Sequence, residues 1–469
     1  MLKKTKIVAT ISDANCEVEF VKELYEEGMN VVRLNTAHQD FEGTKKVIKN
    51  VRKVSDKIPL LLDTKGPEIR TTPSQEEINL KKGDKIFVGG NPDKESSKEC
   101  ICVNYKNFCK DINLYDKILI DDGDIELEVI DKKNDRLICI AKNEGIVKGK
   151  KSVNVPGAHI NLPSLSPKDM DYIDFAIENK IDFIAHSFVR NKKDLSEIQN
   201  ILDKKNSSIK IIAKIENQEG VNNIDEILEN CYGIMIARGD LGIEIAAEKI
   251  PAIQRNIIKK CIEKRKPVIV ATQMLHTMIT HPRPTRAEVS DVANAIYLGA
   301  DAVMLSGETA YGEYPLEAVK IMAKIAKEIE GNKESFDNTS AKSINNETVG
   351  FLTKSAVRAS LILQTKAIIT DTTTGRTARY LSAYRGKNPI FALCYNESVM
   401  RELALSYGVY PTYSKTQNTK GEFIRKLVIP LTEKEHFQKN DLIIVVAGSF
   451  GPSNGASFLE ISAIENLIK

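Results

Sequence analysis

Eight short apolar runs, rich in Val and Ile, recur along the first two thirds of this 469-residue chain, and stretches of helical periodicity separate them. Continuous apolar runs, unlike alternating ones, are typical of parallel strands that are buried on both faces. Eight such strands separated by helices close a (β/α)8 barrel, so the pattern predicts an α/β TIM barrel. The runs are KIVATIS (6–12), NVVRLNT (30–36), PLLLDT (59–64), DFIAHSF (182–188), IKIIAKIE (209–216), GIMIAR (233–238), PVIVAT (267–272) and AVMLSG (302–307).

Two segments of the chain depart from this repeat. Residues 71–157 contain short apolar stretches broken by turn residues, which predicts a small β-barrel domain inserted into the barrel as a lid over the active site. After the polar segment SAKSINNET (340–348), which predicts a linker, the runs AIIT (367–370), PIFALC (389–394) and LIIVVAG (442–448) indicate a C-terminal α/β regulatory domain. We therefore expect a catalytic barrel over 1–70 and 158–340, an inserted domain over 71–157 and a C-terminal domain over 341–469.

Charge and hydropathy exclude several classes of protein. The 67 basic and 64 acidic residues give a net charge of +3, too little for a general affinity for nucleic acid or anionic membranes. No apolar run approaches the roughly 18 residues that cross a bilayer. The first apolar stretch, in MLKKTKIVATIS, is too short for a signal peptide. We expect a cytoplasmic protein with no nucleic-acid partner and no membrane partner.

The eight cysteines form no CxxC pair, so their spacing indicates neither a zinc ribbon nor a thioredoxin-type redox motif. Cys100, Cys102 and Cys109 lie close together in the sequence. Reduced structural thiols are the favoured interpretation of this cluster, and a metal site is the alternative.

Seven of the eight runs end in polar or charged residues, at the strand ends that converge on one face of an α/β barrel. Solvent at a strand end can account for any one of these residues. Because seven ends converge, we expect the residues together to line a single site. They are Arg33, Asn35, Asp63, Thr64, Lys65, His186, Ser187, Lys214, Glu216, Asn217, Arg238, Gly239, Asp240, Thr272, Gln273, Ser306, Gly307 and Glu308.

Three of these residues suggest metal-assisted phosphoryl transfer. Glu216 and Asp240 end neighbouring strands and could share Mg2+, which prefers one or two carboxylates together with water and phosphate oxygens. Lys214 lies two residues before Glu216, so its side chain points to the same face of the strand and could neutralise a transferring phosphoryl group. A simple salt bridge between Lys214 and Glu216 at the rim is the alternative. The backbone amides near Gly239, at a predicted helix start, could hold a carboxylate or phosphate.

No GxxxxGK[ST] and no strand-linked GxGxxG motif occurs, so neither a P-loop nor a Rossmann nucleotide site is indicated. Longer motifs resemble instead those of the pyruvate kinase family, in the same order along essentially the whole chain. The resemblance implies a barrel with an inserted β domain and a C-terminal α/β domain, phosphoryl transfer from phosphoenolpyruvate to ADP that yields pyruvate and ATP in glycolysis, and a homotetramer. The motifs are MNVVRLNTAH (29–38), LLDTKGPEIR (61–70), KSVNVPG (151–157), AKIENQEGV (213–221), GIMIARGDLGIEI (233–245) and ATQMLHTMITHPRPTRAEVSDVANAIYLGADAVMLSGETAYGEYP (271–315).

The resemblance also implies a role for each residue of the site. Arg33 and Lys214 would bind the phosphoryl group, and Thr272 would help to protonate the enolate, through water and Ser306 or Glu308. Backbone amides of Gly239 and Asp240 would hold the substrate carboxylate. The remaining assignments are Glu216 and Asp240 for Mg2+ (or Mn2+), Arg70, Lys151, Asn35 and His38 for the nucleotide with its second Mg2+, and Asn35, Asp63 and Thr64 for K+.

A segment of the third domain is similar to the effector-binding loop of the family. Hydroxyls and amides before a helical stretch could bind a phosphorylated effector. Capping of the helix by a threonine is the alternative, since Ser and Thr favour that position. The residues are Thr372, Thr373, Thr374, Gly375, Arg376 and Thr377.

Several residues depart from the family pattern. Ala37 removes a hydroxyl ligand from the K+ site, although Glu68 matches the K+-dependent form of the family. Asp13, His276 and Tyr311 replace the usual residues on the nucleotide side, so we expect an elevated Michaelis constant for ADP. A catalytically weak paralogue with an effector-binding role is therefore one alternative. Another barrel enzyme that forms an enolate, such as a metal-dependent lyase or aldolase, is a third, but it would need no inserted domain.

Overall fold

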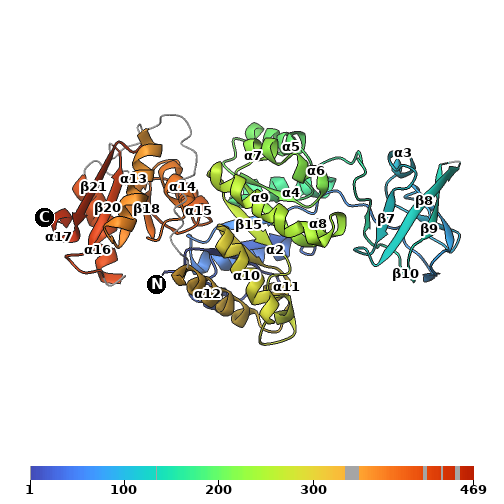
Figure 1. The fold of residues 1–469 in the computed structure, drawn as a ribbon, viewed down its shortest axis with the longest axis horizontal. Coiled ribbons are helices and arrows are strands. Elements are labelled where there is room, and N and C mark those ends of the chain that lie inside the picture. Colours follow the sequence, from blue (N-terminus) through green and yellow to red (C-terminus); the bar gives the residue numbers. More distant parts are fainter. Residues whose placement is uncertain are drawn as a thin grey trace.

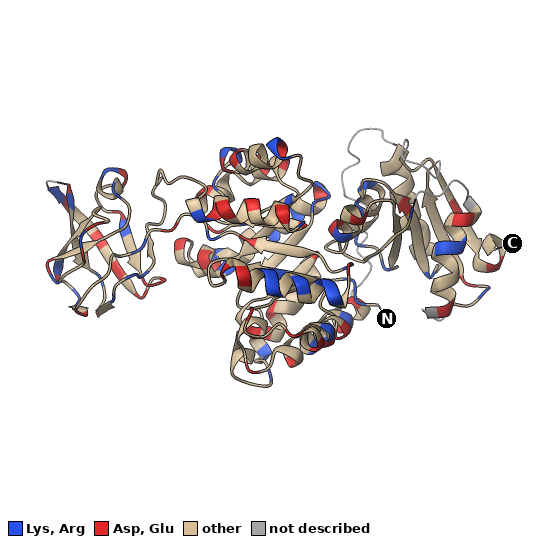
Figure 2. Cartoon of the chain, turned by 180° about the vertical axis from the view of Figure 1, so that it is seen from behind, with Lys and Arg blue, Asp and Glu red and all other residues tan. Residues whose placement is uncertain are grey.

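The computed structural model describes residues 2–133, 135–332, 348–415, 420–434, 437–448 and 455–468. The chain forms three units in a row, with the barrel between the inserted segment and the C-terminal unit (Figure 1). Most of the predicted linker, residues 340–347, lies outside the described residues. Basic and acidic residues occur on all three units in the reverse view (Figure 2), in keeping with the nearly balanced charge of the chain.

All eight predicted strands form and close into a parallel barrel, which confirms the predicted (β/α)8 architecture. The strands run around the barrel in the order β1, β16, β15, β14, β13, β12, β3, β2. Their bounds are β1 Lys6–Thr10, β2 Val31–Asn35, β3 Leu60–Asp63, β12 Phe183–His186, β13 Lys210–Ile215, β14 Gly233–Ala237, β15 Val268–Ala271 and β16 Ala302–Leu305.

Alternate residues of each strand point to opposite sides of the barrel wall. In β12, Phe183 and Ala185 belong to the apolar cluster inside the barrel, whereas Ile184 packs against the surrounding helices. Burying a large apolar side chain such as Phe183 or Ile184 contributes roughly 1.5–3 kcal/mol to the stability of the fold. The helices of this unit are α1 Val18–Glu26, α2 Phe41–Val54, α4 Pro167–Glu178, α5 Lys192–Lys204, α6 Gln218–Asn222, α7 Ile224–Asn230, α8 Arg238–Glu244, α9 Ile250–Glu263, α10 Arg286–Leu298, α11 Gly307–Ala310 and α12 Pro315–Asn332.

The segment between β3 and β12 is built from strands, as its turn-rich sequence predicts, but among the described pairs its strands form two open sheets and not the closed small β-barrel that we expect. Six strands form one sheet in the order β11, β7, β8, β9, β5, β6, and β10 pairs with β4. The elements are β4 Ile78–Leu80, β5 Lys85–Gly89, β6 Cys100–Cys102, α3 Phe108–Asp111, β7 Lys117–Ile120, β8 Ile125–Lys133, β9 Arg136–Ala141, β10 Gly145–Val147 and β11 Val153–Asn154.

The C-terminal unit is a five-stranded sheet in the order β19, β18, β17, β20, β21, in which only the edge strand β21 is antiparallel among the described pairs. The three predicted strands are present as β17, β18 and β20, whereas β19 and β21 were not predicted. The elements are α13 Thr348–Ile362, β17 Ala367–Thr372, α14 Arg376–Ala383, β18 Ile390–Cys394, α15 Glu397–Leu403, β19 Val409–Tyr413, α16 Lys420–Lys434, β20 Leu442–Ala447, β21 Phe458–Ala463 and α17 Ile464–Ile468.

Charged side chains fasten the C-terminal unit to the start of the barrel strands. Arg401 Nε donates to Asp182 Oδ1 at 2.6 Å, just before β12, and Lys6 Nζ, at the start of β1, donates to the Val409 carbonyl at 2.6 Å. The C-terminal unit therefore lies at the end of the barrel opposite to the polar strand ends.

The eight cysteines are free thiols, and seven of them are buried. Burial raises the pKa of Cys100 to about 11 and that of Cys139 to about 12. Within the described residues no three His, Cys, Asp or Glu side chains are grouped so that they could hold a metal ion. No described helix combines the length and the apolar character needed to cross a bilayer.

Candidate active site

Lys214 lies at the centre of a buried polar cluster at the carboxyl ends of the barrel strands. Its Nζ lies 3.0 Å from Asp63 Oδ1 and 3.0 Å from Glu216 Oε1, and donates to Ser187 Oγ at 2.8 Å. The ion pair between Lys214 and Glu216 that the alternative interpretation expects is present, but Lys214 is only 9% exposed, so the pair is buried and is not a surface salt bridge at the rim. Strands β3, β12 and β13 are neighbours in the barrel, and this adjacency brings the four side chains together.

Arg33 binds Asp63 from the other side. Its Nε donates to Asp63 Oδ2 at 2.6 Å, and its Nη1 donates to Thr10 Oγ1 at 3.0 Å. Burial opposes ionisation of Asp63, but the charges of Arg33 and Lys214 outweigh it and lower the pKa of this carboxyl. Asp63 thus stays ionised and holds both cations in place.

The carboxylates of the cluster outnumber its cations. Burial raises the pKa of Glu216 to about 7, with the nearby Asp240 charge adding to this effect against Lys214, and burial also raises the pKa of Asp240. Three carboxylates face two cations, so the cluster carries one net negative charge when all are ionised. Oxygen ligands with an excess negative charge are the donors that Mg2+ prefers. Glu216 and Asp240 therefore fit a divalent cation.

Thr272 has a strained backbone directly after β15. Its φ is 66°, in the left-handed region, where a β-branched residue costs about 1–3 kcal/mol and where functional sites are enriched. The Thr272 Oγ1 accepts a hydrogen bond from the Gly239 amide at 2.8 Å and donates to the Ala271 carbonyl at 2.6 Å. The Gly239 amide, which we expected to hold the substrate carboxylate, is thus engaged by this hydroxyl, so a substrate carboxylate at this position would have to replace it.

Arg238 positions Thr272, a role that neither the strand pattern nor the family resemblance predicts. Its Nη2 donates to the Thr272 carbonyl at 2.7 Å, and its Nη1 donates to Asp291 Oδ1 at 2.7 Å. Ser187 was likewise not assigned a role, although it contacts Lys214. Both residues follow a barrel strand, and this placement was the available signal for a function.

Ser306 follows β16 on the same face of the barrel. Its amide donates to Glu308 Oε2 at 2.8 Å, and the Leu275 amide donates to Glu308 Oε1 at 3.3 Å. The buried Glu308 therefore ties the segment after β16 to the segment after β15, on which Thr272 lies.

Two of the four predicted nucleotide residues lie side by side where the inserted segment begins and ends. The Thr71 amide donates to the Lys151 carbonyl at 2.8 Å, which places Arg70 beside Lys151. Arg70 pairs with Glu68 at 2.7 Å, and Lys151 pairs with Asp121 at 2.7 Å.

Of the other two predicted nucleotide residues, Asn35 is the last residue of β2 and His38 follows that strand, where it is exposed. In the described part of the chain no hydrogen bond or ion pair joins them to Arg70 or Lys151. The carboxylate of Asp13 packs over Gly43 in the first turn of α2, where helix amides favour a negative charge.

The predicted K+ ligands are already engaged within the protein. Asn35 Oδ1 accepts from the Ala37 amide at 3.2 Å, and Thr64 Oγ1 accepts from the Ser187 amide at 3.0 Å. The Thr64 carbonyl accepts from Ser187 Oγ at 2.6 Å. Asp63 is shared with Arg33 and Lys214, so Ser187 connects the predicted K+ site to the cluster around Lys214.

The predicted effector loop connects β17 to α14. Gly375 has a φ of 77° and occupies the N-cap position, so the alternative interpretation, a capping threonine, is wrong. Gly375 serves there because only glycine adopts this φ without strain. Thr372 Oγ1 instead accepts from the Gly375 amide at 2.9 Å. Thr374 and Arg376 are exposed, whereas Thr372 and Thr377 are buried.

We expect His186 to lie at the rim with the other strand ends, and the structure contradicts this expectation. The histidine follows Ala185, which faces the barrel interior, so its ring lies on the helix side, where it is fully buried. Neither ring nitrogen has a hydrogen-bond partner within the described residues. Burial lowers the pKa of His186 from 6.5 to about 4.

We predict that His186→Leu makes the protein more resistant to acid. Between pH 6.5 and 4 the unfolded chain binds a proton at this histidine and the folded protein does not, so the native protein loses stability as the pH falls. Removing the imidazole should recover about 2.5 kcal/mol at pH 4.5 relative to pH 7. Urea denaturation at both pH values measures the difference. His281→Leu, at an exposed histidine, is the control and should show no such gain.

Comparison with known proteins gives the same assignment. A model of the pyruvate kinase barrel domain matches residues 2–319, and a model of the pyruvate kinase alpha/beta domain matches residues 351–462. The chain is 48% identical to a pyruvate kinase from Borreliella burgdorferi, over 100% of this chain and 98% of that protein. It is 44% identical to a pyruvate kinase from Bacillus licheniformis, over 100% of this chain and 81% of that protein.

A solved structure shows the same arrangement of the chain. The crystal structure of a pyruvate kinase from Cryptosporidium parvum superposes with a TM-score of 0.94, at 36% identity, and covers 98% of this chain and 96% of that one. The closed barrel, the polar cluster at its carboxyl rim, both domain matches and these full-length relatives agree. This chain belongs to the pyruvate kinase family.

Proposed function

We propose that this chain transfers the phosphoryl group of phosphoenolpyruvate to ADP, giving pyruvate and ATP in glycolysis. The observation that carries the proposal is the buried cluster in which Asp63 and Glu216 hold the Lys214 ammonium at 3.0 Å each. A buried, fixed cation of this kind stabilises a transferring phosphoryl group without reorganising during the reaction.

Arg33 and Lys214 divide the binding of the phosphoryl group. The Arg33 guanidinium has five N–H donors in a planar fork that matches phosphate, so it keeps donors for substrate while it binds Asp63. Lys214 lies on β13 and Arg33 on β2, with β12 and β3 between these strands, and both side chains contact Asp63 at the end of β3. Their shared anchor fixes the distance between the two cations, and this distance sets where the phosphoryl oxygens lie.

Metal ions complete this site. Glu216 and Asp240 would hold Mg2+ (or Mn2+), and Asn35, Asp63 and Thr64 would hold K+. A bound divalent cation orients the substrate oxygens and neutralises the charge that develops on them. The protein contributes the orientation of its ligands, since the Phe188 amide donates to Glu216 Oε2 at 2.7 Å and leaves Oε1 near Lys214.

The residues that follow β15 and β16 would deliver the proton to the enolate. The hydroxyl of Thr272 is too weak an acid to act alone, so we assign it, with Ser306, to holding the water that protonates the methylene carbon. Glu308 fixes this pair, because its two carboxylate oxygens accept amide hydrogen bonds from the segments that carry them.

The rest of the chain serves nucleotide binding and regulation. Arg70 and Lys151, with Asn35 and His38 on the barrel, would bind ADP when the inserted domain (71–157) closes on the catalytic barrel (1–70 and 158–340). The C-terminal domain (341–469) would bind a phosphorylated effector at residues 372–377. We further propose a cytoplasmic homotetramer.

The test is steady-state pyruvate formation from phosphoenolpyruvate and ADP, with and without Mg2+ and K+. We expect turnover that requires Mg2+ and rises with K+ although Ala37 lacks a hydroxyl, and a Michaelis constant for ADP above that for phosphoenolpyruvate. Near-zero turnover at saturating ADP, from a folded protein that still binds phosphoenolpyruvate, would contradict the proposal and favour the catalytically weak paralogue.

A further inference from the structure

A cavity of about 310 Å3 lies where the inserted segment joins the barrel. Both connecting segments form part of its wall, and the rest comes from the segments after β12, β13 and β14, including helices α6 and α8. None of the residues assigned above to substrate, metal, nucleotide or effector lines it. We call it the hinge cavity; its walls come from residues 67–69, 153–155, 157–160, 162, 188, 190, 217–219, 222 and 244.

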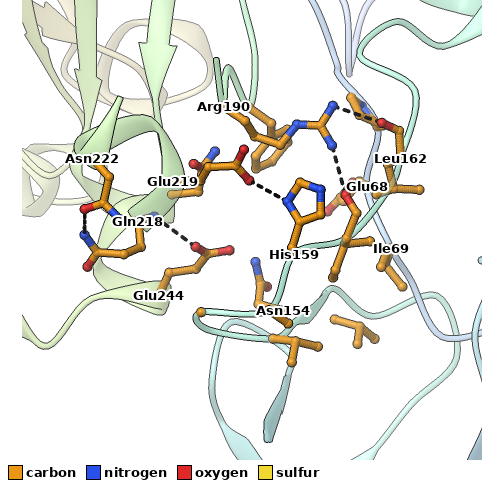
Figure 3. A pocket seen from close by; sticks show the side chains of 18 residues that line it. Glu68, Ile69, Asn154, His159, Leu162, Arg190, Gln218, Glu219, Asn222 and Glu244 are labelled. Carbon is orange, nitrogen blue, oxygen red and sulfur yellow. Dashed lines mark hydrogen bonds and ion pairs between the residues drawn. The ribbon is translucent and has the colours of Figure 1, made fainter. Parts of the chain in front are cut away.

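One part of the hinge cavity is apolar and another is polar. Ile69, Val153 and Phe188 contribute apolar surface. Figure 3 shows the Glu244 carboxylate, with the side chains of Asn154, His159 and Glu219, around the same space. An apolar wall facing a few convergent polar groups is the usual composition of a small-molecule site.

The charges around the hinge cavity do not cancel. Arg190 is neutralised by Asp194 at 2.9 Å, and Glu68 is neutralised by Arg70 at 2.7 Å. Glu219 Oε2 lies 3.1 Å from His159 Nδ1.

Glu244 is the carboxylate without a counter-charge. It accepts a hydrogen bond from the Gln218 amide at 3.2 Å, and no Lys, Arg or His within the described ranges forms an ion pair with it. Burial, assisted by the charge of Glu219, raises the pKa of Glu244 to about 7. A cation beside this half-buried carboxylate would therefore be favoured.

We propose that the hinge cavity binds a small organic ammonium ion with an apolar body. The ammonium group is held by Glu244, with Glu219 close by, and the apolar body packs on Ile69, Val153 and Phe188. An organic anion is disfavoured there because Arg190 is already satisfied by Asp194 and by the carbonyls of Ile160 and Leu162.

A ligand in this position would fix the orientation of the inserted segment. The Val153 amide donates to the Ile69 carbonyl at 2.8 Å, so both connections move together, and Arg70 follows Ile69 directly. On the barrel side, the Phe188 amide binds Glu216. Occupancy should therefore change the Michaelis constant for ADP more than that for phosphoenolpyruvate, a consequence that rests on the proposed function.

Binding is tested without turnover, by calorimetric titration of the full chain with 2-phenylethylamine. Two analogues with nearly the same apolar body serve as controls, the neutral 2-phenylethanol and the anionic phenylacetate. We expect the amine to bind and both analogues to bind at least roughly tenfold more weakly, because a charge-assisted hydrogen bond is lost. Equal binding of the amine and the alcohol would overturn the assignment to an ammonium ion.

Two variants locate the site. Glu244→Gln keeps the shape and should weaken amine binding roughly tenfold, whereas Glu248→Gln, at an exposed position outside the cavity, should leave it unchanged. Ala158→Phe fills the cavity from a partly exposed position and should abolish binding in a protein with wild-type thermal stability. Amine binding that survives both Glu244→Gln and Ala158→Phe, or no binding to the wild type, would overturn the proposal.

The kinetic consequence is checked separately. If the wild type turns over, the amine should shift the Michaelis constant for ADP, and Ala158→Phe should remove that shift. If it does not turn over, the proposed function fails while the calorimetric result still stands or falls on its own.

Discussion

Lys214→Met should lower the rate of pyruvate formation by roughly 100- to 1,000-fold, the scale of losing one preorganised group that stabilises a transition state. The Lys214 side chain is buried, and three oxygen atoms fix the position of its Nζ. We therefore expect that no exposed lysine can take its place. Methionine keeps the length and the apolar stem of lysine, so the change removes mainly the charge. Asp63 retains Arg33, whereas Glu216 loses its cation.

The loss must be separated from misfolding and from loss of substrate. Calorimetric titration with phosphoenolpyruvate and Mg2+ should show that the variant still binds its substrate, because Glu216, Asp240 and Arg33 are unchanged. Lys210→Met, at the opposite end of the same strand, is the matched control and should turn over at nearly the wild-type rate, since its Nζ is 3.9 Å from Glu402 and far from the rim. Wild-type turnover of Lys214→Met would refute the role assigned to this lysine.

The barrel was predictable because its physical cause leaves a trace in the sequence. Parallel strands that are covered on both faces need continuous apolar runs, and every residue of β1, β14 and β15 is buried. The two strands that were not predicted lack such a continuous apolar run. β19 includes Pro411, and every residue of β21 is only partly buried, since both strands lie at the edges of their sheet.

The site was predictable along each strand but not between strands. The spacing of two residues placed Lys214 and Glu216 on one face, and their 3.0 Å contact follows from it. The contacts of Lys214 with Asp63 and Ser187 depend on barrel closure, which sets β3 next to β12 and β12 next to β13. His186 shows why a strand end alone does not place a side chain. Neighbouring residues of a strand point to opposite sides of the barrel wall, so a difference of one position moves a side chain from the rim to the helix layer.

The hinge cavity could not be predicted from the sequence. For Arg238, the place after β14 indicated a function, but not its contact with Thr272. Arg238 acts through the carbonyl of Thr272, and backbone contacts leave no residue-type signal. The cavity forms from segments that are distant along the chain, 67–69, 153–162 and 217–222 among them. Its acidic residues are ordinary loop residues until the fold surrounds them with apolar walls.

Arg385→Met should lower the free energy of unfolding by about 3–5 kcal/mol, the cost of leaving one partner of a buried ion pair alone. Arg385 Nη2 lies 2.6 Å from Asp301 Oδ2, and the two side chains are only 4% and 3% exposed. Arg385 Nε also donates to the Gly299 carbonyl at 2.9 Å, so one side chain joins the C-terminal unit to the base of the barrel. Urea denaturation followed by far-UV circular dichroism measures the loss, and Lys387→Met, at an exposed neighbouring position, is the control.

The double variant Asp301→Asn with Arg385→Met decides whether the buried charge is the cause. The amide side chain introduced by Asp301→Asn could still accept from the Tyr407 amide, which donates to Asp301 Oδ1 at 2.9 Å, while it carries no charge that needs a partner. We therefore expect the double variant to lose at least about 1 kcal/mol less stability than the sum of the two single variants. Strict additivity would mean that Arg385 acts through packing on the Tyr407 ring, whose centroid is 5.0 Å from its guanidinium carbon, and not through Asp301.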